Sequence, residues 1–287
     1  MRSCKFLLTI GLVGLILGCK QVAKTSVPTR KEPITRVVSL SPSTTELIAD
    51  TYDAEVLAGR TQSCTYPTGI EKVPVVCGVK PDYEKIAAIK PQVIVYDSAL
   101  FSAGELEKLK QIPGATTFEF KTTDINTFYD SLARLGAAIG GERRYSEYAD
   151  KIQKAINLTA ALKTSTPTKI AIVMGGESQT LYWDGTDSFR SKLIKAIGAI
   201  PVGADGTQFV PANIEGLIAA NPDAIITTGK SKEILNDSRL KNIKAVQTGK
   251  VFALNPDAVL RAGSRIDKFV LTLGQIAWTN VVPPKPE

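Results

Sequence analysis

Apolar positions along the chain follow two alternating periods, which predict alternating strands and helices. Short runs such as 36–40 and 93–96 are rich in β-branched residues and continuously apolar, as expected for strands buried on both faces of a sheet. The segments between them open with capping residues and then place apolar side chains at helical spacing. This order predicts an α/β protein whose sheets are parallel-rich and covered by helices.

A repeated segment indicates that the chain contains two similar halves. Residues 82–95 align without a gap with residues 213–226. Each copy contains an Asx residue, a glutamate two positions later, an apolar helical segment, a proline and a strand. A repeat at constant spacing predicts two lobes that are each contiguous in sequence, at 34–141 and 165–282.

One long helix is expected between the two lobes, over residues 142–164. Tyr145, Tyr148, Ile152 and Ile156 recur there at helical spacing. A helix of about 20 residues is about 30 Å long and could cross between the lobes once. Such a crossing leaves less freedom for hinge closure than flexible linkers would.

The beginning of the chain has the pattern of an export signal. Arg2 and Lys5 precede an apolar run that is too short to span a membrane. The run ends in a Leu-Gly-Cys sequence that resembles a lipobox. We therefore expect a signal peptide over 1–18, lipidation of Cys19, and a tether over 19–33 that holds the protein outside the cytoplasm. An ordinary signal peptide with an incidental cysteine is the alternative.

Composition excludes several classes of function. The chain has no histidine, so Ser-His-Asp and Cys-His catalysis and imidazole metal sites are excluded. Its net charge of +7 is spread along the sequence and gives no clustered nucleic-acid footprint. We expect a monomeric protein that is not an enzyme, has no metal site, binds no nucleic acid and meets the membrane only through its lipid.

Two cysteines, Cys64 and Cys77, lie in the part of the chain that would be exported. In an oxidising compartment they are expected to form a disulfide that closes a small loop. Such a bond would contribute about 3 kcal/mol to stability. Two free, buried thiols are the alternative.

Several segments together resemble the class III substrate-binding proteins of bacterial ABC importers, in the branch that binds cobalamin, siderophores and haem. These segments are 36–46, 64–67, 249–254 and 261–265, with both copies of the repeat. The resemblance covers most of residues 34–280. It implies two Rossmann-like α/β lobes joined by a single long helix, a ligand in the cleft between them, and an ABC permease with its ATPase as partner.

The resemblance also implies a role for the repeated glutamates. In the vitamin B12-binding members, one glutamate at the top of each lobe docks against arginines of the permease, and the matching positions are Glu84 and Glu215. The alternative is that each carboxylate only stabilises a first helical turn, by about 0.3–1 kcal/mol. Glu46 fits a capping box with Ser43 and is expected to have no further role.

Candidate ligand contacts are the residues that follow predicted strands, because ligands of open α/β sheets bind beyond the carboxyl ends of the strands. They are Tyr66, Tyr96, Phe101, Tyr182, Trp183, Phe209 and Arg261. Aromatic faces with a few polar groups suit a large, flat ligand. Core packing is the alternative for any single ring, and about half of the set is expected to touch the ligand.

Cobalamin is the leading ligand, because residues 64–67 and Tyr96 resemble the cobalamin-binding branch. One departure is Cys77-Gly78, where the B12 binders carry a tryptophan. A ferric siderophore or haem is the alternative, and haem would need a tyrosine as axial ligand. No further cofactor is expected. A surface receptor or sensor that works without a permease is a second class of function that fits the same sequence.

Overall fold

The computed structural model describes residues 32–164, 166–175 and 180–279. The predicted signal peptide, Cys19 and most of the tether lie outside these residues, so their assignments stay predictions. No helix in the described part of the chain combines the length and hydropathy that a membrane span requires.

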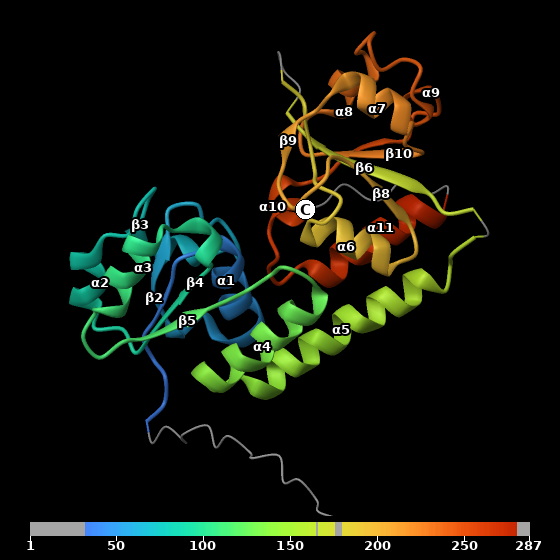
Figure 1. Ribbon diagram of the computed structural model, residues 1–287. Helices are drawn as coiled ribbons and strands as arrows, with labels where there is room; N and C mark the ends of the chain where they lie inside the picture. Colours follow the sequence, from blue (N-terminus) through green and yellow to red (C-terminus); the bar gives the residue numbers. More distant parts are fainter. Residues whose placement is uncertain (1–31, 165, 176–179, 280–287) are drawn as a thin grey trace, which may run out of the picture. The chain divides into compact units, whose positions relative to one another are not determined.

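The first lobe is built on a five-stranded sheet in which every pairing is parallel (Figure 1). In spatial order its strands are β3 (Val75–Cys77), β2 (Leu57–Thr61), β1 (Val37–Ser39), β4 (Val93–Tyr96) and β5 (Thr116–Glu119). The central strands β1 and β4 are buried along their whole length. Continuous burial explains why apolar residues do not alternate with exposed polar ones in these strands, in which Ser39 is the one polar residue and is itself buried.

Helices cover both faces of this sheet. They are α1 (Pro42–Glu46), which continues as a π-helical segment (Leu47–Asp53), α2 (Tyr83–Ile89), α3 (Ala103–Lys110) and α4 (Ile125–Ile139), with short 3-10 turns at 54–56, 70–72 and 98–100. Val93 and Val95 pack toward the π-helical segment and α4, whereas Ile94 and Tyr96 pack toward α2 and α3. Successive residues of one strand therefore belong to two separate apolar cores.

A long helix, α5 (Glu142–Ala160), follows the first lobe. Its buried side chains include Tyr145, Tyr148 and Ile152, which belong to the same core as α4 and the last helix, α11 (Ile266–Trp278). Figure 1 shows α11 alongside α5, and the two helices approach closely where Gly274 meets Thr159. A β-carbon at Gly274 would lie 2.3 Å from the Thr159 side chain.

The second lobe has a six-stranded sheet. Its strands are β11 (Val251–Ala253), β10 (Ala224–Thr227), β6 (Lys169–Met174), β7 (Tyr182–Trp183) and β9 (Val210–Pro211), with β8 (Ile200–Val202) beside the first half of β6. Strands β7 and β9 pair antiparallel and the others parallel. Its helices are α6 (Phe189–Ala196), α7 (Ile214–Ala220), α8 (Ser231–Leu235), α9 (Lys244–Gln247) and α10 (Pro256–Leu260).

The sequence repeat corresponds to one structural unit in each lobe. Asp82 caps α2 and Asn213 caps α7, and each helix is followed by a central strand. Both helices end at a residue with left-handed backbone, Lys90 (φ 53°) and Asn221 (φ 45°), just before a proline. The predicted fold class, two α/β lobes with parallel-rich sheets and one long connecting helix, is confirmed.

The predicted disulfide is wrong in this structure, because Cys64 and Cys77 are both free, buried thiols. Cys64 belongs to the core on the α4 side of the sheet, and Cys77 belongs to the core on the α2 side. The Cys64 Sγ atom lies 3.1 Å from Thr61 Oγ1 and 3.2 Å from Thr45 Oγ1. Two thiols packed in separate cores match the alternative that the sequence left open.

Candidate ligand-binding site

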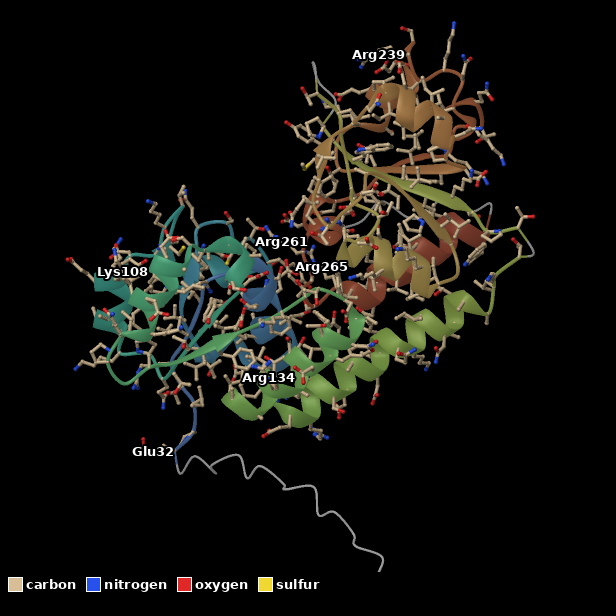
Figure 2. The ribbon with its side chains drawn as sticks, in the orientation of Figure 1. Glu32, Lys108, Arg134, Arg239, Arg261 and Arg265 are labelled. Atoms are coloured by element: carbon tan, nitrogen blue, oxygen red, sulfur yellow. The ribbon has the colours of Figure 1, made fainter. Side chains whose placement is uncertain are left out.

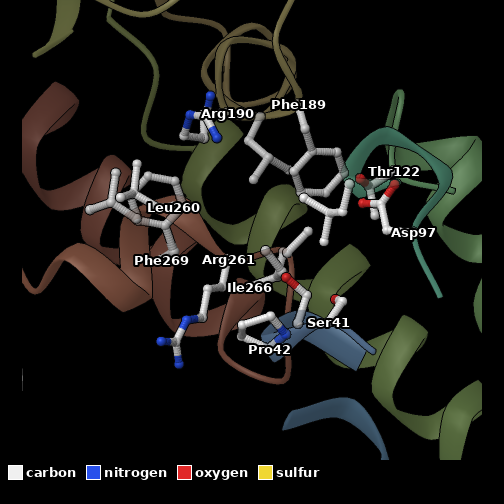
Figure 3. A pocket seen from close by; sticks show the side chains of 15 residues that line it. Ser41, Pro42, Asp97, Thr122, Phe189, Arg190, Leu260, Arg261, Ile266 and Phe269 are labelled. Carbon is white, nitrogen blue, oxygen red and sulfur yellow. The ribbon is translucent and has the colours of Figure 1, made fainter. Parts of the chain in front are cut away.

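A cavity of about 250 Å³ lies where loops of the first lobe meet α6 and the α10–α11 segment of the second (Figure 3). The first lobe lines it with Ser41, Pro42, Ser43, Asp97, Leu100 and Thr122. The second lobe and α11 line it with Phe189, Arg190, Leu193, Val259, Leu260, Arg261, Ala262, Ile266 and Phe269. Apolar and aromatic walls with few polar groups are typical of a small-molecule site.

Hydroxyl groups fix the loop between β1 and α1 at the cavity. Ser41 caps α1 by accepting a hydrogen bond from the Thr44 amide at 3.3 Å. Behind it, Ser39 Oγ lies 2.7 Å from Thr44 Oγ1 and accepts a bond from Thr45 Oγ1 at 2.9 Å. The bonds satisfy these buried hydroxyls and hold Pro42 and Ser43 at the cavity wall.

Asp97 comes directly after β4 and faces the cavity beside Thr122 (Figure 3). Its Oδ1 atom accepts the Ala99 amide at 2.9 Å, which caps the short turn at 98–100. Burial raises the pKa of the Asp97 carboxyl, and the nearby charge of Glu119 acts in the same direction. The turn also carries Leu100 to the cavity rim, where it is 56% exposed.

Arg190 enters the cavity from the first turn of α6 and is held on several sides. Its Nε and Nη2 atoms donate to Asp184 at 2.8 and 2.7 Å, and Asp184 is only 2% exposed. Ser188, the cap of α6, donates to the same carboxylate at 2.5 Å. The Arg190 Cζ atom lies 4.7 Å from the ring centroid of Phe209. These contacts fix the plane of the guanidinium group.

Glu46 and Arg261 join the two lobes at the floor of the cavity. Glu46 is 1% exposed and accepts bonds from Arg261 Nη1 at 3.0 Å and Arg265 Nη2 at 2.7 Å. Burial raises the pKa of Glu46, although both guanidinium groups oppose the shift. The expectation of a capping box with Ser43 is wrong, because Ser41 caps α1 and the Glu46 carboxylate pairs with arginines.

Further contacts surround this ion pair, and we call Glu46, Arg261 and Arg265 the inter-lobe latch. Arg261 also donates to the Ser63 carbonyl at 2.9 Å and pairs with Asp257 at 2.8 Å. The Arg265 Cζ atom lies 4.4 Å from the Tyr66 ring centroid. Figure 2 labels Arg261 and Arg265 close to each other. The latch therefore ties the loop after β2 to the segment that leads into α11.

Helix α5 contacts the same place through Tyr148. The Tyr148 hydroxyl donates to the Gly263 carbonyl at 2.8 Å and accepts from the Ile266 amide at 3.0 Å. A β-carbon on Gly263 would lie 2.4 Å from Glu46 Oε2, so this glycine is what allows the carboxylate to approach. The first lobe, α5 and the second lobe therefore meet in one buried polar cluster.

The structure places the predicted ligand contacts in several environments. Arg261 lines the cavity. Tyr96 and Trp183 are 7% and 9% exposed and pack in lobe cores, Phe101 packs on the same core as Tyr96, and Tyr182 is half-buried between Met174 and Pro211. Tyr66 and Phe209 stack under Arg265 and Arg190. Ligand contact by these aromatic residues stays a prediction.

The cavity wall also contains Asp97, Leu100, Phe189 and Arg190, which the sequence patterns do not indicate. Asp97 directly follows Tyr96 at the end of β4, where successive side chains lie on opposite faces of the strand. Leu100 lies in the 3-10 turn just before Phe101. For Arg190, a usable signal was the capping serine two positions earlier, which marks a helix start that points at the cleft.

Glu84 and Glu215 lie in equivalent positions of the repeat. Both are exposed and lie in the first turns of α2 and α7. Within the described ranges, no three His, Cys, Asp or Glu residues are grouped so that they could hold a metal ion.

Comparison with known proteins identifies relatives along most of the chain. Residues 37–258 match the model of the family described as periplasmic binding protein. An uncharacterised ABC transporter substrate-binding lipoprotein of Bacillus subtilis is 28% identical, covering 88% of this chain and 82% of that protein. The vitamin B12-binding protein of Vibrio parahaemolyticus is 26% identical, covering 82% of this chain and 86% of that protein.

Solved structures have the same fold. The periplasmic haem-binding protein of Vibrio cholerae superposes with a TM-score of 0.74 at 18% identity, covering 84% of this chain and 98% of that one. The periplasmic vitamin B12-binding protein of the same organism gives 0.70 at 21% identity, covering 85% and 98%. Both identities are low, so these likenesses establish the architecture alone.

Proposed function

Because the chain belongs to the periplasmic binding protein family, we propose that it captures a corrinoid, with cobalamin as the leading candidate, in the cavity between its lobes. The family is one of substrate-binding components of ABC importers, which act outside the cytoplasm and deliver a small molecule to a permease. In this proposal, lipidated Cys19 anchors the protein to the membrane, and the permease with its ATPase receives the ligand.

The observation that carries the corrinoid assignment is the internal pairing of the cavity's cations. Arg190 is paired with buried Asp184, and Arg261 is paired with Glu46 and Asp257. Haem and many ferric siderophores carry carboxylates or net negative charge, and they would enter a site whose guanidinium groups are already neutralised. The rim of a corrinoid ends mainly in neutral carboxamides, which form hydrogen bonds without requiring a free cation.

The described residues of the cavity wall also favour a corrinoid over haem, because none of them is a histidine or tyrosine that could bind haem iron. The chain contains no histidine, and no tyrosine is found among the described residues that line the cavity. Phe189, Leu260 and Phe269 provide apolar surface for a flat macrocycle. A corrinoid is larger than the cavity, so in this proposal one edge of the ring enters it and the rest covers the mouth beside exposed Leu100.

Delivery to the permease is proposed to involve Glu84 and Glu215. Two exposed carboxylates at equivalent positions of the two lobes can each pair with an arginine of the permease. The helix dipole alone favours a carboxylate in a first turn by about 0.3–1 kcal/mol, so only a transport measurement separates the two roles.

Calorimetric titration of residues 20–287 with cyanocobalamin, haemin and ferric siderophores tests the ligand. We expect cyanocobalamin to bind with a Kd below about 1 μM and the other ligands to bind far more weakly. Neither heat nor a thermal shift with any corrinoid would exclude the leading assignment. Tight binding of haemin or a siderophore instead would move the chain to that branch of the class.

A further inference from the structure

Two polar side chains of the cavity wall, Arg190 and Asp97, are not part of the inter-lobe latch and can still form hydrogen bonds with a ligand. Arg190 Nη1 has no hydrogen-bond partner within the described ranges, whereas Nε and Nη2 are occupied by Asp184. Because Asp184, Ser188 and Phe209 fix the guanidinium group, the remaining N–H donors point in a set direction. Figure 3 shows Arg190 and Asp97 on opposite sides of the cavity.

Unlike the other carboxylates near the cavity, Asp97 has no cationic side chain as a partner among the described residues. Glu46, Asp184 and Asp257 each form an ion pair with an arginine, whereas Asp97 forms no ion pair in the part of the chain that the structure describes. Its Oδ1 atom accepts a hydrogen bond from a backbone amide, that of Ala99. Of the charged neighbours, Glu119 is itself negative and pairs with Lys121 at 3.2 Å.

We infer that Asp97 and Arg190 determine ligand specificity, by accepting a hydrogen bond from a neutral N–H donor at one wall of the cavity and donating to a carbonyl oxygen at the other. This inference rests on the proposed function and narrows it: the ligand edge that enters the cavity bears carboxamides. A carboxamide supplies both the donor for Asp97 and the acceptor for Arg190. A carboxylate in its place would supply no donor and would lie against an unpaired negative charge.

The physical consequence is selection against anionic ligands. A half-buried carboxylate without a cation repels a second carboxylate, because little solvent screens the two charges. A site that is built to bond an N–H group strongly rejects the analogue that lacks it. Asp97 therefore excludes carboxylate-bearing macrocycles, and Arg190 cannot compensate because Asp184 already neutralises it.

The test uses cyanocobalamin and its monocarboxylic acids, in each of which one peripheral carboxamide is hydrolysed. We expect residues 20–287 to bind cyanocobalamin roughly 10- to 100-fold more tightly than at least one monoacid. The variant Asp97→Asn keeps the Ala99 cap through its amide oxygen, removes the negative charge, and should reduce that preference to less than about threefold.

A matched control is Asp130→Asn, which makes the same charge change at an exposed position of α4. It should leave the preference unchanged. A second variant, Asp97→Ser, can cap the turn through its hydroxyl group and should lose the preference as well, so the test does not depend on the folding of a single variant. Thermal melts of each variant confirm that it is folded.

The outcomes distinguish this inference from the proposed function. If the unaltered chain binds no corrinoid, the proposed function fails and this inference fails with it. If it binds cyanocobalamin but accepts every monoacid equally well, or if Asp97→Asn keeps the full preference, the inference alone is wrong. Loss of the preference in both Asp97 variants and its retention in Asp130→Asn would support it.

Discussion

Arg261 donates a hydrogen bond to Glu46 at 3.0 Å across 215 positions of sequence, and this buried contact closes the floor of the cavity. One residue comes from α1 of the first lobe, and the other precedes α11. Since Arg261 also lines the cavity, the latch holds the lobes together and shapes the binding site at the same time.

Removing the Glu46 carboxylate should destabilise the protein. The Glu46 side chain is 1% exposed and that of Arg265 is 11% exposed. Glu46→Ala therefore leaves a mostly enclosed guanidinium group without its carboxylate partner, and breaking a buried pair in this way costs about 3–5 kcal/mol. The measurement is the free energy of unfolding in urea. Asp257→Asn is the control: its side chain is 37% exposed, so the change should cost no more than about 1 kcal/mol. Equal effects of the two variants would contradict a buried latch.

Gly263 offers a steric test of the same contact. In Gly263→Ala the new β-carbon would lie 2.4 Å from Glu46 Oε2 and 3.2 Å from Glu46 Cβ, so the side chain must move. Overpacking of this kind typically costs about 1–3 kcal/mol. Gly104→Ala in α3 is the control, because no atom lies within 4 Å of its new β-carbon, and alanine favours a helix by up to about 1 kcal/mol. Unfolding curves that show no loss for Gly263→Ala would refute the close approach.

Local sequence signals predicted the elements but not the latch. The α2–β4 and α7–β10 units have their own caps, proline stops and apolar periods, so they could be recognised without any knowledge of tertiary contacts. The partner of Glu46 depends on how the lobes pack. In its own segment, a glutamate three positions after Ser43 looks like a capping residue, and nothing nearby marks Arg261 and Arg265 as its partners.

At the end of β4, the residue that lines the cavity differs by one position from the residue that the sequence indicates. Its place after the apolar residues 93–95 makes Tyr96 a candidate ligand contact, but Tyr96 packs in the α2–α3 core, and Asp97 lines the cavity instead. A shift of one residue reverses the face on which a strand side chain lies. Large aromatic side chains also gain more from burial than from exposure at a cleft, so aromatic content alone is a poor guide to the cavity wall.

The two cysteines should be free thiols without any reductant. In residues 20–287, a thiol assay should detect none in the native protein and two in guanidinium chloride, because Cys64 and Cys77 are both buried and unpaired. If two thiols are detected only after a reductant is added, Cys64 and Cys77 form a disulfide and the prediction of free thiols is wrong. The single variants Cys64→Ser and Cys77→Ser, each of which should give one thiol in guanidinium chloride, show which cysteine each thiol comes from.

The ionisation of Cys77 makes stability depend on pH. Burial raises the pKa of Cys77 to about 11 from an ordinary 9.0, so the folded state holds its proton more tightly than the unfolded state does. Its contribution to stability is complete below pH 9 and is lost as the pH rises toward 11. The variant Cys77→Ser should therefore lose less stability than the parent between pH 9 and 11 in urea titrations. Parallel losses in the two proteins would contradict this.

Charge reversal at both repeated glutamates should separate delivery from capture. Glu84 and Glu215 are exposed and lie outside the cavity wall, so Glu84→Arg with Glu215→Arg should leave the calorimetric titration unchanged. Each substituted arginine would face an arginine of the permease, and ligand-dependent stimulation of the permease ATPase in liposomes should disappear. The control is Glu107→Arg, at an exposed position of α3, which should preserve stimulation. If the double variant stimulates the ATPase as well as the parent does, the two glutamates only stabilise their helix ends, and the permease recognises another surface.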